Sequence, residues 1–574
     1  MDKHNTHNES EAAFDRLVED EWAWRLSEFP RLATQAGEHQ HDHRLERMDA
    51  DSLAARLSRW RSTREALRRI SAEQLPPGRR ADHAVYANQI DTLLVELEHG
   101  GAWMPLDGDS AFYSYLPELW REQALHTAEQ LHSHLGRLAA IETYFDDHIE
   151  LLTEALQRGL VPPAVVMQGR DAPLQQMLAW GDARATPYFK PFLQRPTGIA
   201  PADFEKLTQE AERVIAQKVL PAYAKLADFM RHQYLPRTRT TTAARALPGG
   251  EGFYAERVRA FTTLPLTAEQ VHEQGRAEVA RILDDMHRLM RACGAHGTLA
   301  DFLAQLRNDP QHYPTSAEAL LGRASWIAKR VDTVLPRFFG KLPRQPFGVA
   351  PVPDDLAPFY TSGRYVPAAA DSDQAALYWV NTCKLESRAW YALPALTLHE
   401  AVPGHHLQFA LAAENTSQPA YRRLEGLSAH SEGWALYAEF LGSEMGIYQT
   451  PLEEFGRASY EMWRACRLVV DTGLHWLGWT REQAQAYLRE HTALSEHEVT
   501  TEVDRYIGWP GQALSYKVGE MQFRSLRREA EGRLGTRFSL RDFHDHVLAQ
   551  GCVPLPALRS AVQAWAESRA SAPV

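Results

Sequence analysis

The amino-acid sequence predicts a mainly α-helical protein, a large multi-helix fold with one small β-sheet. Long stretches of its 574 residues carry apolar side chains at helical spacing between charged ones. Prolines gather in a few connecting segments, above all in residues 336–367, where long helices are therefore excluded. One short run, residues 375–381, is aromatic and β-branched, as expected for a strand.

Six stretches in the first two thirds of the chain are predicted to be helical. Their apolar residues recur on one face, and few glycines or prolines interrupt them. The longest could form either one helix or a tight pair of helices. The predicted helices are 52–69, 82–98, 121–158, 201–234, 267–293 and 316–335.

Three regions are expected along the chain. Residues 1–14 read as a polar tail, residues 15–240 as an N-terminal helical region, and residues 241–574 as the region that carries the chemistry. The boundary is placed in residues 237–252 because they are rich in Thr, Arg and Gly. The two larger regions are expected to form one continuous fold.

Composition excludes several classes of protein. The chain is 44% hydrophobic and 24% charged, as soluble globular proteins are. Its net charge of −12 argues against general nucleic-acid binding. No run approaches the ~18 apolar residues of a membrane span. Because the N-terminus lacks the apolar core of a signal peptide, a cytoplasmic location is expected.

The segment HEAVPGHH, residues 399–406, carries the strongest chemical signal. Imidazoles bind metal ions, and a carboxylate next to a metal ligand can act as a general base toward water. In the common H-E-x-x-H motif the two histidines lie four residues apart on one helical face. Here His405 and His406 follow His399 by six and seven residues, so this is an expanded variant with Glu400 as the candidate base.

A break in the helix is needed to bring these histidines together. On an unbroken helix His405 would lie about 120° around from His399, and His406 about 10.5 Å further along the axis. Pro403 has no N–H, and Gly404 permits unusual backbone angles. Two residues could therefore loop out and return His405 to the side of His399, although spacing alone leaves His406 as an alternative ligand.

The third ligand is expected on a following helix. Glu432, within SAHSEGWALYAE at residues 428–439, is the best candidate. Two histidines and one glutamate leave a position open for water, as in catalytic zinc sites. Glu439 lies two turns later, where it could orient a ligand or simply be a solvated carboxylate.

Three segments together make the sequence similar to a known family. HEAVPGHHLQ, EGWALYAE and RYIGWPGQALSYKVGE resemble the bacterial family called domain of unknown function 885, grouped with the gluzincin-type zinc metallopeptidases. The resemblance runs from about residue 15 to about residue 556. It implies a mostly helical metallohydrolase fold and one zinc ion per chain. By resemblance Glu400 is the base and the metal ligands are His399, His405, in preference to His406, and Glu432.

Further site residues are predicted from donor-rich segments. An amide hydrolase needs a donor facing the developing oxyanion, and Tyr516 is the first choice, with Tyr506 second. Arg505 and Lys517 could hold a substrate carboxylate, or form structural ion pairs around the turn at residues 510–511. Resemblance also suggests that the strand 375–381 pairs with an extended peptide, placing Asn381 near the cleft, although an ordinary core strand is an equal alternative.

The function predicted from these residues is zinc-dependent hydrolysis of peptide or related amide bonds, with short peptides as substrates. Two other functions remain open. Two histidines and a carboxylate also describe the iron site of non-haem oxygenases, but Glu400 would have no task there. The histidines could also form a structural metal site in a non-catalytic scaffold. Spacing does not distinguish zinc from manganese or cobalt, and the oligomeric state is not predicted.

Overall fold

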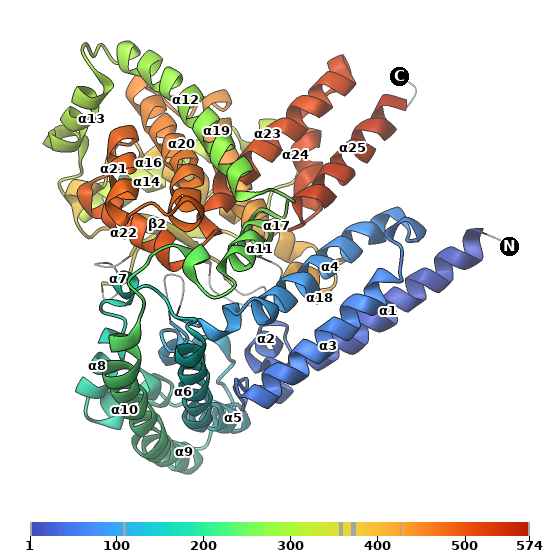
Figure 1. Cartoon of the computed structure of the whole chain (residues 1–574), viewed down its shortest axis with the longest axis vertical. Helices are drawn as coiled ribbons and strands as arrows, with labels where there is room; N and C mark the ends of the chain where they lie inside the picture. Colours follow the sequence, from blue (N-terminus) through green and yellow to red (C-terminus); the bar gives the residue numbers. More distant parts are fainter. Residues whose placement is uncertain are drawn as a thin grey trace. The chain divides into compact units, whose positions relative to one another are not determined.

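The computed structural model describes residues 3–571, except residues 107–110, 355–356, 358–359, 369–374 and 425. Helices dominate it, and the predicted mainly α-helical class is confirmed (Figure 1). The chain divides into two compact units: the first is Met1–Phe253 with Ile507–Trp509, and the second is Tyr254–Tyr506 with Pro510–Val574. Among the described residues, no helix is long and apolar enough to span a membrane.

The first unit consists of amphipathic helices and short connecting turns. Its early helices α1, α3 and α4 pack against one another, while α5 packs on α9 and α6 on α10. The helices of this unit are α1 (Lys3–Glu28), α2 (Pro30–Gln35), α3 (Ala50–Arg68), α4 (Pro77–Glu98), α5 (Ala128–Ala139), α6 (Ile141–Arg158), α7 (Ala164–Met167), α8 (Ala172–Ala179), α9 (Pro201–Val214) and α10 (Leu220–Phe229).

Several predicted boundaries change in this unit. Residues 3–14, expected as a polar tail, belong to α1, since neither glycine nor proline interrupts residues 3–28. Of the stretch 121–158, only residues 128–158 form α-helices, and they are a pair, α5 and α6, which meet at Ala140. The stretch 201–234 contains two π-helical turns, Ile215–Val219 and Met230–Tyr234, and the first precedes Pro221, which lacks the N–H of a regular helix.

The second unit has long helices around a short, buried one. Figure 1 shows α12 and α20 side by side, and α19 packs on α23. The helices that lie wholly or mostly here are α11 (Gly250–Thr262), α12 (Ala268–Ala292), α13 (Leu299–Asn308), α14 (Ala317–Asp332), α15 (Leu335–Phe338), α16 (Leu393–Glu400), α17 (His405–Glu414), α18 (Ala420–Arg423), α19 (Ser428–Glu444), α20 (Pro451–Thr472), α21 (Arg481–His491), α22 (Glu496–Gly508), α23 (Ser515–Leu534), α24 (Leu540–Ala549) and α25 (Leu555–Ser571).

A three-stranded sheet lies beside the buried helix α16. Its strands are β1 (Phe347–Pro351), β2 (Gly363–Val366) and β3 (Ala376–Val380), in the order β1-β3-β2. β3 pairs in parallel with β1 and antiparallel with β2. The predicted strand 375–381 is therefore the central strand, and the expectation that it pairs with a substrate is wrong because both of its edges are taken. Within the described residues, β2 has the edge nearest α16.

Candidate metal centre

A tight turn joins α16 to α17 and returns the second histidine to the first. α16 ends at Glu400 and α17 begins at His405. The N–H of Gly404 donates to the carbonyl of Leu398 at 2.9 Å. A Cβ at Gly404 would lie only 2.0 Å from the carbonyl oxygen of His399, so the turn requires glycine. As a result, the rings of His399 and His405 lie 4.9 Å apart between centroids.

Three ligand atoms converge beside this turn. The Nε2 atoms of His399 and His405 lie 3.4 and 3.5 Å from Oε2 of Glu432, on α19. The three atoms all lie within 4.8 Å of one another. Ligands ~2.0–2.1 Å from a tetrahedral zinc ion stand ~3.3–3.4 Å apart, close to the two spacings to Glu432. Moreover, Oε2 of Glu432 is buried without a hydrogen-bond partner, so the group fits a cation of this size.

The electrostatics of the three groups also favour a cation. Burial lowers the pKa of His399, but the carboxylates of Glu432 and Glu439 outweigh it and raise that pKa to about 9. Burial raises the pKa of Glu432, but its contacts with His399 and His405 bring it well below the ordinary value. The carboxylate thus requires a positive neighbour, which protonated imidazoles or a bound metal ion supplies. A metal ion bound here would compete with protons for these groups.

The structure distinguishes between His405 and His406, the two candidates for the second histidine ligand. Nε2 of His406 lies 3.1 Å from the carbonyl oxygen of Gln345, and burial lowers its pKa. His405 instead directs Nε2 toward Glu432. Of the two neighbours, His405 is the one that faces the converging ligand atoms.

A buried carboxylate and an arginine hold the first histidine. Nδ1 of His399 lies 2.8 Å from Oε1 of Glu439, which directs Nε2 toward Glu432. Nη2 of Arg464, on α20, lies 3.5 Å from the same oxygen of Glu439. Sequence reasoning missed Arg464 because nothing in the local sequence of α20 indicates a neighbour on α19.

The predicted base has a defined position on the sheet. Oε2 of Glu400 accepts a hydrogen bond from the backbone N–H of Tyr365 on β2, at 2.8 Å. Glu400 follows the candidate ligand His399 directly in the sequence, and only 8% of Glu400 is exposed. Helix α16 thus contributes a candidate metal ligand, the imidazole of His399, and a carboxylate that β2 holds in place.

A close contact between helices brings the predicted oxyanion donor to the site. A Cβ at Gly433 on α19 would lie 2.5 Å from Cα of Gly519 on α23, so the two backbones meet where both residues are glycine. Tyr516 lies in the first turn of α23. Its pKa is raised by burial and then by the Glu432 carboxylate, which makes Tyr516 an electrostatic neighbour of the ligand group. The guanidinium of Arg467 stacks 4.2 Å from the centre of its ring.

A family model described as "Bacterial protein of unknown function (DUF885)" matches residues 30–562. The chain belongs to this family. The family predicted from the three sequence segments is therefore confirmed. No curated protein sequence matches this chain.

Two solved structures resemble this DUF885 protein over nearly its whole length. A crystal structure of a "putative lipoprotein" from Colwellia psychrerythraea is 27% identical, with a TM-score of 0.87, and the match covers 98% of this chain and 99% of that one. A structure from Shewanella oneidensis, also called a "putative lipoprotein" and of unknown function, is 18% identical with a TM-score of 0.70, covering 98% and 100%. The second likeness shows the fold alone. The cytoplasmic location of this chain stays a prediction.

Two other predicted site residues of the DUF885 protein are bonded within the protein. The hydroxyl of Tyr506 accepts hydrogen bonds from Trp463 Nε1 and Arg467 Nε, both at 3.0 Å. Arg505 donates to Gln512 Oε1 at 2.6 Å and pairs with Glu502. Both side chains therefore stabilise the packing of α20, α22 and the turn before α23.

Asn381 also has a structural task. Its Nδ2 atom donates to three loop carbonyls, and its Oδ1 accepts from the N–H of Cys383. The side chain is fully buried. It shapes the loop that precedes β2, and the carbonyls that it binds belong to Ala357, Tyr360 and Thr361.

Lys517 lies in a buried ion-pair network that joins α12, α20 and α23. Its ammonium lies 2.8 Å from Glu461, 2.8 Å from Glu520 and 3.1 Å from Glu278. Its side chain is 0% exposed. Burial lowers its pKa, but the carboxylates outweigh this and raise it to about 12. The DUF885 fold thus directs all three donors of Lys517 toward protein carboxylates.

Replacing Lys517 with methionine is expected to destabilise the protein. Removal of one partner from a buried ionic network leaves buried charges uncompensated, which typically costs about 3–5 kcal/mol. Urea unfolding should show this loss, whereas the same change at the exposed Lys341 should leave the unfolding free energy within about 0.5 kcal/mol. A Lys517→Met protein of unchanged stability would contradict the structural role.

A buried aspartate organises the turn that precedes Tyr516. Asp471 accepts a hydrogen bond from the hydroxyl of Tyr254 at 2.6 Å and another from the N–H of Gly511 at 3.1 Å. Burial raises the pKa of Asp471 to about 7, although both hydrogen bonds oppose the shift. This carboxyl therefore titrates near neutrality in the folded protein.

The raised pKa predicts a pH dependence of stability. The folded protein holds the Asp471 proton more tightly than the unfolded chain, so its contribution to stability is full below about pH 4 and is lost as pH rises toward about pH 7. We expect the stability of the wild type to fall relative to Asp471→Asn over this range, by up to about 1.4 kcal/mol per pH unit. Unfolding curves of both proteins at several pH values test this. A pH-independent difference would contradict it.

Proposed function

We propose that this DUF885 protein is a zinc-dependent hydrolase of peptide or related amide bonds in short peptides. The observation that carries the proposal is the convergence of His399, His405 and Glu432 on one point, with Glu400 fixed next to them. An open fourth position and an adjacent carboxylate are typical of catalytic rather than structural zinc sites.

The residues of the chain would divide the reaction between them. A zinc ion, when bound, supplies a Lewis acid that lowers the pKa of water and polarises a carbonyl. Glu400 accepts a proton from the attacking water and passes it to the leaving amine as the C–N bond breaks. Tyr516 donates a hydrogen bond to the carbonyl oxygen as that oxygen becomes negative.

The edge of β2 supports a path for the substrate. The N–H of Tyr365 points to Glu400 and not to β3, although Tyr365 lies opposite Tyr378 in the β2–β3 register. In an antiparallel pair such a residue directs both its N–H and its C=O away from the partner strand. The N–H of Tyr365 is taken by Glu400, so an extended peptide could donate a backbone N–H to the carbonyl of Tyr365 and present its own carbonyl to the metal.

Removal and return of the metal tests this function. The purified protein should cleave members of a library of short peptides, lose that activity when zinc is removed with a chelator, and regain it when zinc is restored. Mass spectrometry of the products identifies the new termini. A protein that binds one zinc ion per chain but cleaves no peptide or amide would contradict the proposal.

A further inference from the structure

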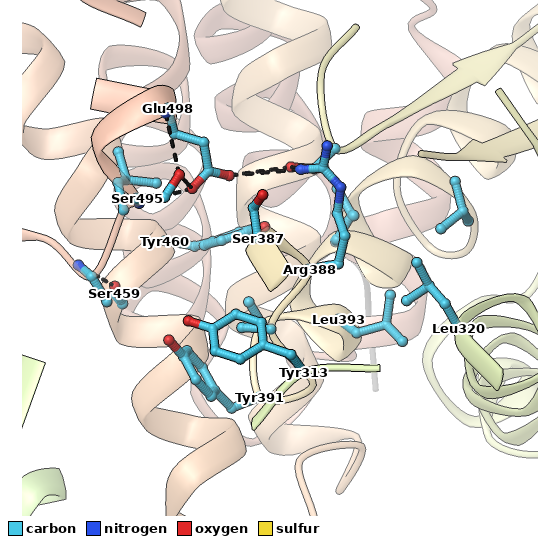
Figure 2. A pocket seen from close by; sticks show the side chains of 18 residues that line it. Tyr313, Leu320, Ser387, Arg388, Tyr391, Leu393, Ser459, Tyr460, Ser495 and Glu498 are labelled. Carbon is cyan, nitrogen blue, oxygen red and sulfur yellow. Dashed lines mark hydrogen bonds and ion pairs between the residues drawn. The ribbon is translucent and has the colours of Figure 1, made fainter. Parts of the chain in front are cut away.

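A pocket in the second unit lies between the start of α16 and the residue before β2. Figure 2 shows its lining, with Leu393 among the labelled side chains. Leu396, which lies one turn before His399, also lines the pocket. Ser362 and Val380 contribute from the ends of the two adjacent strands. The cavity volume of this pocket is about 50 Å³, which suits a small group such as a carboxylate.

The pocket contains a buried arginine with unused donors. Nη1 of Arg388 donates to Oγ of Ser362 at 3.0 Å, and Nε donates to the carbonyl of Asn381 at 3.1 Å. The Arg388 side chain is 9% exposed. In the part of the chain that the structure describes, Nη2 has no partner, so one nitrogen of the guanidinium remains available to a ligand.

An acidic neighbour forms an ion pair with one nitrogen of this guanidinium, Nη1. Oε1 of Glu498 lies 3.9 Å from Nη1 of Arg388, and the two side chains point toward each other in Figure 2. The same oxygen accepts a hydrogen bond from Oγ of Ser362 at 3.4 Å. The other oxygen of Glu498 accepts hydrogen bonds from the backbone N–H and hydroxyl of Ser495. Glu498 is thus satisfied by Ser495, Ser362 and Nη1 of Arg388, whereas Nη2 of Arg388 keeps two donors suited to a carboxylate.

The position of the pocket along β2 relates it to the metal centre. Ser362 precedes Tyr365, whose N–H binds Glu400, by three residues, and a strand rises ~3.3 Å per residue. The arginine therefore lies about 10 Å along the strand from the proposed site of cleavage. A peptide paired antiparallel to β2, the more stable arrangement, runs toward Ser362 with its C-terminal end.

We propose that Arg388 binds the C-terminal carboxylate of the peptide substrate, so that the enzyme releases C-terminal fragments of two or three residues. This proposal rests on the hydrolase function and adds the substrate class, which is short peptides with a free C-terminus. Leu393 and Leu396 offer an apolar wall to the last side chain. In each turnover water adds across one peptide bond, with oxygen to the carbonyl carbon and a proton to the departing amine.

Matched peptides with and without the terminal charge test the proposal. The probes are N-acetylated pentaalanine as the free acid and as the C-terminal amide. The zinc-loaded wild type should cleave the acid with a kcat/KM at least about tenfold above that of the amide, since hydrogen bonds to charged groups are worth that much or more. Arg388→Gln should raise KM for the acid, so that acid and amide are cleaved with about the same kcat/KM. The same change at the exposed Arg344 should leave the preference for the acid unchanged.

A binding measurement separates this inference from the hydrolase proposal. In a Glu400→Gln background, calorimetry should show tighter binding of the acid than of the amide, and Arg388→Gln should abolish the difference. If Arg388→Gln does not fold, Arg388→Lys, which keeps the charge but loses the planar fork, should weaken the preference. Equal binding and equal cleavage of acid and amide by the wild type would overturn the role of Arg388 and leave the hydrolase proposal intact. If the protein bound the acid selectively but cleaved nothing, the hydrolase proposal would be wrong, whereas the role of Arg388 in carboxylate binding would stand.

Discussion

Glu400→Gln should reduce peptide hydrolysis by at least about a hundredfold, because a positioned general base typically contributes ~10²–10⁴-fold to a rate. Glutamine keeps the shape of the side chain, and its carbonyl oxygen can still accept the N–H of Tyr365. It cannot accept the proton of the attacking water. The kcat/KM of zinc-loaded wild type and variant, with metal content and thermal stability measured on the same samples, tests this expectation.

A matched control lies on the next helix. Glu414, at the end of α17, accepts hydrogen bonds from the N–H groups of Arg344 and Gln345, away from the ligand atoms. Glu414→Gln should keep full activity. If Glu400→Gln hydrolysed peptides as well as the wild type, the role assigned to this carboxylate would be wrong. A fall in zinc content with the fall in rate would instead assign Glu400 to metal binding.

Metal binding should distinguish two adjacent histidines. The wild type, purified without a chelator or a histidine tag, should hold about one zinc ion per chain. His405→Ala should lose it because the Nε2 atom of His405 lies 3.5 Å from the Glu432 carboxylate. His406→Ala should retain it because His406 faces the carbonyl of Gln345. Mass spectrometric metal analysis of the three proteins gives the answer directly.

Glu432→Ala extends the same test to the third ligand. It should lose the metal as His405→Ala does, since two imidazoles alone leave the ion without a carboxylate. Thermal unfolding shows whether each variant remains folded. If folded His405→Ala retained the metal, His406 would have to be the second histidine ligand. A wild type that binds neither zinc, manganese nor cobalt would remove the metal centre.

Much of the fold and of the candidate site was predictable because the decisive signals are local. Helical spacing of apolar residues predicted α3, α4, α12 and α14 to within a few residues, except for the five-residue shift at the start of α4. A proline and a glycine in HEAVPGHH indicated the break that returns His405 to His399. Such patterns act within one or two helical turns, so they are readable without the rest of the chain.

Contacts between distant segments were decided only by the tertiary structure. The sequence by itself determined a helical chain with a His-Glu-His group and a carboxylate about thirty residues later. Folding decided that His405 and not His406 faces Glu432, that Lys517 meets three carboxylates, and that β3 is central. Each of these outcomes depends on tertiary contacts, that is, on which side chains from distant parts of the sequence pack around a residue. Spacing within a motif carries no information about them.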